Sequence, residues 1–305
     1  MSTHSFLRES KLFIVYGGNK YRIYTNTALS FSQTFASDSY PVKTLHNQSK
    51  MFEGAAITQA NPTDFSFDVP LTKEKDESPV IDLLSELNNG QLTSFDLYIQ
   101  TGSAVFKITS AVVTNGSLDI NPNNQFTVQL QGQGTKIERV GDESSNIPGN
   151  LAAESSTRTP LLVYPVVSID SLDMGNIIST TIRIENQISW TEFATLQNSL
   201  NVTNASNIMR PTTYTVDKRT ISGAVRQYQN DDNITQFDNF STNSNITIKA
   251  IEIGKASDAT PFFQVSMNPA SFTTRMEPAE IYTQSYDFRT VDNANSVSDV
   301  ITQYS

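Results

Sequence analysis

A chain of 305 residues suits one large domain or two ordinary ones, because single hydrophobic cores tend to stop growing at roughly 250–300 residues. Apolar residues make up 37% and charged residues 17%, which excludes a disordered polyelectrolyte. The 21 Lys and Arg against 31 Asp and Glu give a formal charge of −10, so the surface should on average repel nucleic acid. The absence of cysteine excludes disulfides, thiolate nucleophiles and zinc–sulfur sites.

Residues 1–12 lack the apolar run of a secretory signal, and no segment approaches the roughly 18 apolar residues of a membrane span. We therefore expect a chain made in the cytoplasm, without a membrane anchor.

Short strands dominate the chain from its start. Apolar and polar residues alternate in segments such as 95–99 and 126–130, as expected of a sheet packed on one face. Turn residues such as Gly17-Gly18 and Asn115-Gly116 separate these segments. The sequence predicts strands in the first half at 12–16, 21–24, 30–35, 65–70, 94–101, 105–113 and 126–130.

One segment of the first half predicts a helix. Ser78 precedes a proline at the first helical position, and apolar residues recur with helical spacing up to Leu87. Farther along, apolar periodicity lapses over 141–159, where Gly, Ser, Asn and Pro accumulate as in a linker. We expect a first domain at 1–140, a linker at 141–159 and a second domain at 160–305.

The second half repeats the plan of the first at an offset of about 150 to 160 residues. Segment 30–35 aligns with 181–186, and 65–67 aligns with 221–224. The predicted helix aligns with 231–240, and the three strands after it align with 245–254, 261–273 and 280–289. The predicted fold class is mainly β, with two tandem β-sandwich or half-barrel domains that each carry a short flanking α-helix.

A long excursion at 40–64 separates the first two repeated strands, and its counterpart runs from about 200 to 213. Loops beyond roughly 12–15 residues without structure of their own tend to be functional or disordered. Exposed apolar groups at this density favour a surface that another chain covers, the alternative being a loop folded back on its own core. The candidate contact residues are Tyr40, Val42, Leu45, Met51, Phe52, Ile57, Ile208 and Met209.

No catalytic, cofactor or metal site is predicted. The histidines, His4 and His46, lack an evident carboxylate partner, and no nucleophile elbow is present. The pairs Asp170/Asp173 and Asp231/Asp232 could bind a cation, but solvated surface and helix N-terminal positions explain them as well. Trp190 suits a core or interface position better than a sugar platform.

The layout resembles that of the major tail tube proteins of long-tailed bacteriophages, most closely the two-domain kind whose ring is a trimer. The resemblance covers residues 6 to about 291 and rests on 6–15, 29–33, the long excursion, 64–67 and the helix after it, all in one order. It implies an inner sheet that joins neighbouring subunits into a barrel around a lumen, and three copies per pseudo-hexameric ring.

The resemblance also implies a virion tail location and stacked rings whose acidic lumen conducts genomic DNA to the host without specific binding. Its implied partners are copies of the same chain, the tape-measure protein and the tube initiator and terminator proteins. Strand alternation does not say which side chains face the lumen. Two alternatives stay open: a tube-initiating ring at the baseplate, and a soluble β-sandwich module that binds carbohydrate or a receptor.

Overall fold

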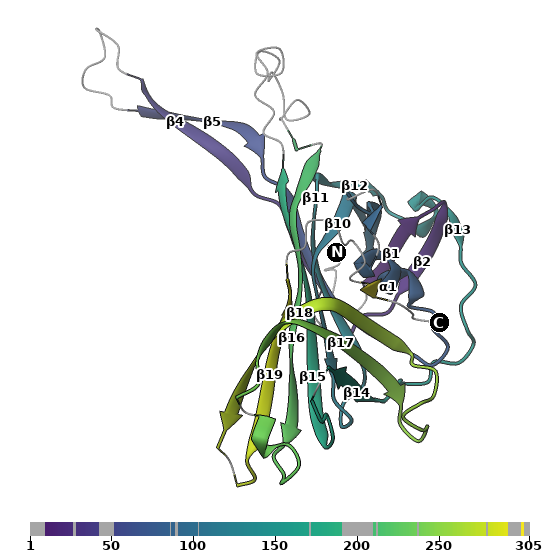
Figure 1. Ribbon diagram of the computed structural model, residues 1–305. Helices are drawn as coiled ribbons and strands as arrows, with labels where there is room; N and C mark the ends of the chain where they lie inside the picture. Colours follow the sequence, from purple (N-terminus) through teal and green to yellow (C-terminus); the bar gives the residue numbers. More distant parts are fainter. Residues whose placement is uncertain are drawn as a thin grey trace.

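The computed structural model describes residues 10–26, 29–42, 52–85, 87–88, 91–102, 104–170, 172–190, 210–211, 213–236, 238–278, 280–291 and 300–301. It confirms a mainly β fold (Figure 1). No helix in these ranges is long and apolar enough to cross a membrane.

We call the elements up to residue 141 the first unit. They are β1 (Lys11–Tyr16), β2 (Asn19–Ile23), β3 (Ser30–Ser32), β4 (Phe35–Val42), β5 (Phe52–Ala60), β6 (Thr63–Pro70), α1 (Ser78–Ser85), β7 (Leu87–Asn88), β8 (Gln91–Leu92), β9 (Phe95–Gln100), β10 (Val105–Ile120), β11 (Thr127–Gly134) and β12 (Lys136–Gly141). A 3-10 turn (Ser144–Asn146) and β13 (Asn150–Leu151) follow.

The second unit contains β14 (Val163–Ile169), β15 (Ile177–Trp190), β16 (Tyr214–Tyr228), a 3-10 turn (Ile234–Gln236), β17 (Ser241–Glu252), β18 (Phe263–Glu277), β19 (Thr283–Thr290) and β20 (Val300–Ile301). Strands pair in the order β3-β6-β11-β10-β9-β1 in the first unit and β15-β16-β19-β18-β17-β14 in the second. The predicted repeat is therefore present in the pairing of the strands.

The long strands β10 and β18 each change pairing partners along their length. The first part of β10 pairs with β9 and β12, and its later part pairs with β11 and β15. Likewise, β18 pairs first with β17 and β20 and then with β19. A bulge marks the change in both strands, where three residues of the long strand span two residues of its partner: Ile108 to Ala111, and Met267 to Ala270.

The predicted helix is confirmed as α1, which packs on the apolar face of β10. A Cβ added to Gly116 would lie 2.1 Å from Leu84 Cδ1, so the helix approaches the strand where no side chain intervenes. Buried residues of both units, including Leu118 and Ile182, belong to one continuous hydrophobic core. The two units are thus packed together through apolar side chains.

The predicted second helix at 231–240 is wrong, since the described part of this segment forms only the 3-10 turn. Local side-chain bonds explain the difference. Asn230 Oδ1 accepts hydrogen bonds from the backbone N–H of Asp232 and of Asn233, and Asn233 Nδ2 donates to Tyr228 O. Such bonds give the backbone an alternative to helical hydrogen bonding.

The predicted linker is bound to the first unit along its course. β13 pairs in parallel with β2, and the Thr159 backbone N–H donates to Glu74 Oε2 at 2.8 Å. Arg158 forms an ion pair with Glu77, which is only 2% exposed and also accepts a hydrogen bond from Thr72 Oγ1. The segment therefore fixes the path between the units, while the division into domains stays a prediction.

Candidate assembly surface

The two units are joined edge to edge by β10 and β15. Six consecutive residue pairs form this junction, from Asn115 opposite Glu185 to Ile120 opposite Thr180. At its centre Leu118 lies opposite Ile182, and both side chains are 0% exposed. The sheet therefore runs without interruption from the first unit into the second.

The shared bulge allows the units to be compared residue by residue. Because Ala111 corresponds to Ala270, Val112 corresponds to Ser271, and their partners Gln133 and Arg289 correspond in turn. On β6, Asp64 lies opposite Gln133 and also opposite Ser32 of β3. On β16, Ser222 lies opposite Arg289 and also opposite Arg183 of β15, so Ser32 is equivalent to Arg183. The sequence alignment of 30–35 with 181–186 gives the same equivalence, so two independent routes agree.

By this comparison, β18 is equivalent to β10 and β3 is equivalent to β15, the two strands of the internal junction. The counterpart of Leu118 is Met276 on β18, and the counterpart of Ile182 is Phe31 on β3. Both counterparts are only part-buried. Within the described ranges, no strand pairs with the second edge of β3, or with that edge of β18 beyond Phe272.

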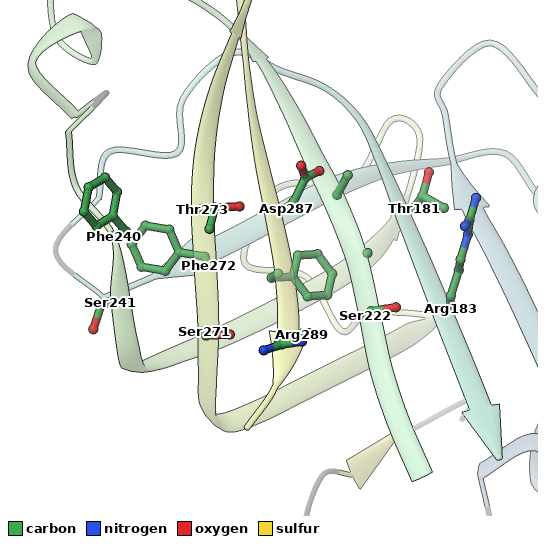
Figure 2. Close-up of a pocket in the computed structure, with 13 residues that line it drawn as sticks. Thr181, Arg183, Ser222, Phe240, Ser241, Ser271, Phe272, Thr273, Asp287 and Arg289 are labelled. Atoms are coloured by element: carbon green, nitrogen blue, oxygen red, sulfur yellow. The ribbon is translucent and has the colours of Figure 1, made fainter. Parts of the chain in front are cut away.

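The face of this sheet opposite the core is polar. In the second unit it forms a hollow of about 1090 Å³ across β15, β16, β19 and β18 (Figure 2). Register places Arg183, Ser222, Arg289 and Ser271 in one row across these strands. A smaller hollow lies at the corresponding place in the first unit, lined by residues such as Ser30, Asp64 and Gln131.

Charge distinguishes the two halves of this polar face. In the first unit, on β3, β6, β11 and residues 115–120 of β10, it carries Asp64, Asp68 and Asp119 and no Lys or Arg. In the second unit it carries four arginines, one lysine and three carboxylates: Arg183, Glu185, Lys218, Arg226, Arg275, Glu277, Asp287 and Arg289. The sequence did not identify this face, because the register of the strands was unknown.

The described parts of the long excursion belong largely to two antiparallel strands, β4 and β5, which we call the hairpin. β4 pairs with β5 along its whole length, and Figure 1 shows this hairpin extending away from the rest of the molecule. The sequence analysis did not predict these two strands, whose backbone groups form hydrogen bonds with each other within the hairpin. Of the predicted contact residues, Val42 lies opposite Phe52, Tyr40 opposite Gly54, and Ile57 opposite Ser37. Leu45, Met51, Ile208 and Met209 lie outside the described residues.

Trp190, Asp170 and Asp173, which the sequence analysis considered as candidate site residues, form hydrogen bonds within the fold. Trp190 Nε1 donates to Gln133 Oε1 at 2.8 Å, so the tryptophan links the second unit to the first. Asp170 Oδ2 accepts from the Asn245 backbone N–H, and Asp173 Oδ1 accepts from that of Gly175. In the part of the chain that the structure describes, no three His, Asp or Glu side chains gather as metal ligands. His4 and His46 fall outside it.

A family model described as the bacteriophage baseplate tube protein family matches residues 2–304. The chain belongs to this family. A structural role in the tube of the phage tail or baseplate follows, with a place in the virion tail and assembly with other tail proteins. No curated protein sequence matches the chain. The expected resemblance to tail tube proteins is thus confirmed at the level of a phage tube protein.

Proposed function

We propose that this baseplate tube family member forms closed rings by pairing β18 of one copy with β3 of the next. The observation that carries the proposal is the β10–β15 junction. The chain already contains one joint of this kind, and among the described residues the equivalent edges of β18 and β3 have no strand partner. Unpaired strand edges favour pairing with another chain, and closure removes them.

The internal junction predicts the register between copies. Arg275 would lie opposite Ser32 of the next copy, Met276 opposite Phe31, and Glu277 opposite Ser30. The pair of Met276 and Phe31 would take the central apolar place that Leu118 and Ile182 occupy inside the chain. Burial of both side chains would stabilise the joint by removing apolar surface from water.

Two exposed aromatic side chains support this register. Phe35 is 45% exposed and corresponds to Asn186, whose side chain is buried and donates to Val113 O at the internal junction. The counterpart of Val113 is Phe272, and Figure 2 shows Phe240, which is 71% exposed, beside it. Pairing of the copies would bring Phe35 to these two rings and cover apolar surface that otherwise faces water.

A head-to-tail contact of this kind gives a ring when the rotation between copies closes. With two units per chain, we propose three copies and a pseudo-sixfold ring, as the tail tube resemblance implies. The polar face would then line the lumen, because the apolar core covers the opposite face of the sheet. Genomic DNA would pass along the polar face, and the role would be structural and not catalytic.

We propose the baseplate segment of the tube as the location of the ring, in line with the description of the family. Bulk tube polymerisation is a second candidate, supported by the extended β4–β5 hairpin, which could contact an adjacent ring. Tape-measure, initiator and terminator proteins would be neighbours in either case. Electron microscopy of the purified protein separates the two candidates: single rings or short stacks fit the baseplate, and long homopolymers fit the bulk tube.

Cysteine cross-linking tests the ring joint, since the chain has no cysteine of its own. Ser32→Cys combined with Arg275→Cys should give disulfide-linked multimers on oxidation. Ser117→Cys with Arg183→Cys, the internal counterpart, should give a disulfide within one chain because these residues lie opposite each other. Phe31→Cys with Arg275→Cys places the thiols on opposite faces and should not cross-link. Persistent monomers in the first variant, with the internal disulfide formed, would refute the joint.

A further inference from the structure

The four arginines of the polar face set the second unit apart from the first. Their counterparts are Ser32 for Arg183, Asp68 for Arg226, Ser117 for Arg275 and Gln133 for Arg289. None of these counterparts is a cation. The repeated fold therefore tolerates uncharged or acidic side chains at all four positions, so the fold itself does not require arginine there.

Two of the four arginines form ion pairs within the sheet. Arg275 Nη2 lies 2.9 Å from Glu277 Oε1, and Arg226 pairs with Glu277 Oε2. These three side chains surround Ser285, which is 1% exposed although it lies on the polar face. Arg226 and Arg275 thus shield Ser285 from solvent and share the Glu277 carboxylate.

Arg183 and Arg289 differ from Arg226 and Arg275 in ion pairing. Both are exposed, and neither forms an ion pair with any described residue. They lie in one row with Ser222 between them, so their Cα atoms are two strand spacings apart, roughly 9–10 Å. Figure 2 shows both along the same hollow, which also presents the hydroxyl groups of Thr181, Ser222, Ser271 and Thr273.

These groups fit a phosphate backbone. A guanidinium donates two parallel hydrogen bonds to a phosphate and stays charged at any physiological pH, and hydroxyl groups add further donors. The hollow is open and extends across four strands, as suits one side of a long polyanion. Glu185 and Asp287 flank the two arginines on the same face and would keep such a contact weak.

We infer that Arg183 and Arg289 form a contact site for the phosphate backbone of duplex DNA. The choice of DNA as occupant rests on the proposed function, in which the polar face lines the lumen. Each ring would then alternate sectors that carry only carboxylates with sectors in which two arginines have no ion pair with any described residue. DNA would be touched at regular intervals around the lumen wall and released easily, because the flanking carboxylates oppose firm binding.

The test measures anisotropy of a fluorescent DNA duplex titrated with the full chain at several salt concentrations. Relative to the wild type, Arg183→Gln/Arg289→Gln should raise Kd by roughly tenfold at low salt. The slope of log K against log salt should fall in magnitude by about 1.8, since each phosphate contact contributes about 0.9. Arg22→Gln/Arg139→Gln removes the same charge from strands β2 and β12 and should leave both quantities nearly unchanged.

Lysine replacements add a geometric control. Arg183→Lys/Arg289→Lys keeps the charge and should bind DNA better than the glutamine variant but less well than the wild type, because a lysine cannot form the bidentate contact. No binding by the wild type at low salt, or equal losses in the Arg183/Arg289 and Arg22/Arg139 variants, would overturn the inference.

Ring formation and DNA contact fail separately. In one outcome, Arg183→Gln/Arg289→Gln abolishes the Ser32→Cys/Arg275→Cys cross-link but leaves DNA binding unaltered. This outcome would show that Arg183 and Arg289 form a contact between copies, and it would refute the DNA site. Absence of that cross-link in the otherwise wild-type chain, with the arginine effect on DNA intact, would refute the ring and leave the phosphate site standing.

Discussion

Phe65 on β6 covers Gly132 on β11, so closely that a Cβ added to the glycine would lie 2.2 Å from Phe65 Cζ. The second unit contains the same pair of residue types, but the phenylalanine and the glycine lie on the opposite strands of the pair. Phe288 on β19 lies opposite Gly223 on β16, and a Cβ there would be 2.6 Å from Phe288 Cζ. An aromatic ring over a cross-strand glycine is thus a shared element of the repeated unit.

Gly132→Ala should destabilise the protein by about 1–3 kcal/mol, because the added methyl group overpacks a rigid site. The Val112 carbonyl oxygen, 2.3 Å from the added Cβ, is part of the backbone and cannot rotate away. Urea unfolding would measure the change. Gly175→Ala is the matched control, since its nearest neighbour is 3.5 Å away, and a comparable loss in both variants would contradict the packing argument.

Leu118→Asp and Met276→Asp should have different effects although the residues are equivalent. A charge at the fully buried Leu118 should unfold the internal junction, because nothing there neutralises it. A charge at the part-buried Met276 should leave the monomer folded and abolish rings. Circular dichroism and light scattering separate these outcomes, with Met276→Leu as the control that keeps the rings; rings formed by Met276→Asp would speak against the proposed joint.

The hairpin of β4 and β5 gives a test of ring stacking. Phe52→Asp should leave the ring joint intact and reduce stacking of rings in electron micrographs, because a desolvated carboxylate disfavours an apolar contact. Phe52→Leu keeps an apolar side chain and should stack as the wild type does. Equal stacking of both variants would exclude Phe52 from the contact between rings.

Glu252 on β17 connects the two units electrostatically. The hydrogen bond from Lys73 of the first unit, together with that from Lys255, lowers the pKa of the Glu252 carboxyl. A carboxyl whose pKa is lower in the folded chain contributes stability above its unfolded value, and that contribution is lost as pH falls through the folded value. Urea midpoints should therefore decline less on acidification in Glu252→Gln than in the wild type. Glu280→Gln, an exposed change elsewhere, should follow the wild-type curve.

Tyr286 is the centre of a buried polar cluster. Its hydroxyl group accepts from Gln227 Nε2 at 2.8 Å and donates to a glutamine oxygen, Gln284 Oε1 at 2.8 Å or Gln236 Oε1 at 3.2 Å. Tyr286→Phe should cost about 1–3 kcal/mol, because it leaves buried amide groups without a partner. Tyr282→Phe, at an exposed position, should cost little by urea unfolding, and equal effects would refute the role of the cluster.

Alkaline pH gives a second test of Tyr286. Burial raises the pKa of Tyr286 to about 12, above the ordinary 10.0. The unfolded chain would release this proton first, so the wild type should lose stability as pH rises from about 10 to about 12. Tyr286→Phe should lose less over this range.

The sequence predicted the strands and the repeat because alternation and turn residues are local signals. The alignment of 30–35 with 181–186 even gave the correct equivalence of β3 and β15. The second helix failed because the side chains of Asn230 and Asn233 bond to nearby backbone groups, an outcome that apolar spacing does not reveal. The rows of the polar face could not be predicted, since Arg183 and Arg289 become neighbours only through the register of three strands.

The fusion of two units in one chain changes how a ring can be put together. Every β10–β15 joint closes during the folding of a single molecule, at the effective concentration of a tether and independently of how much protein is present. Only the joints between β18 and β3 would depend on collisions between molecules, so a ring needs half as many joints between molecules as it would with separate units. The bonds of Thr159 and Arg158 to the first unit hold that tether in one conformation, which lowers the entropy lost when the internal joint forms.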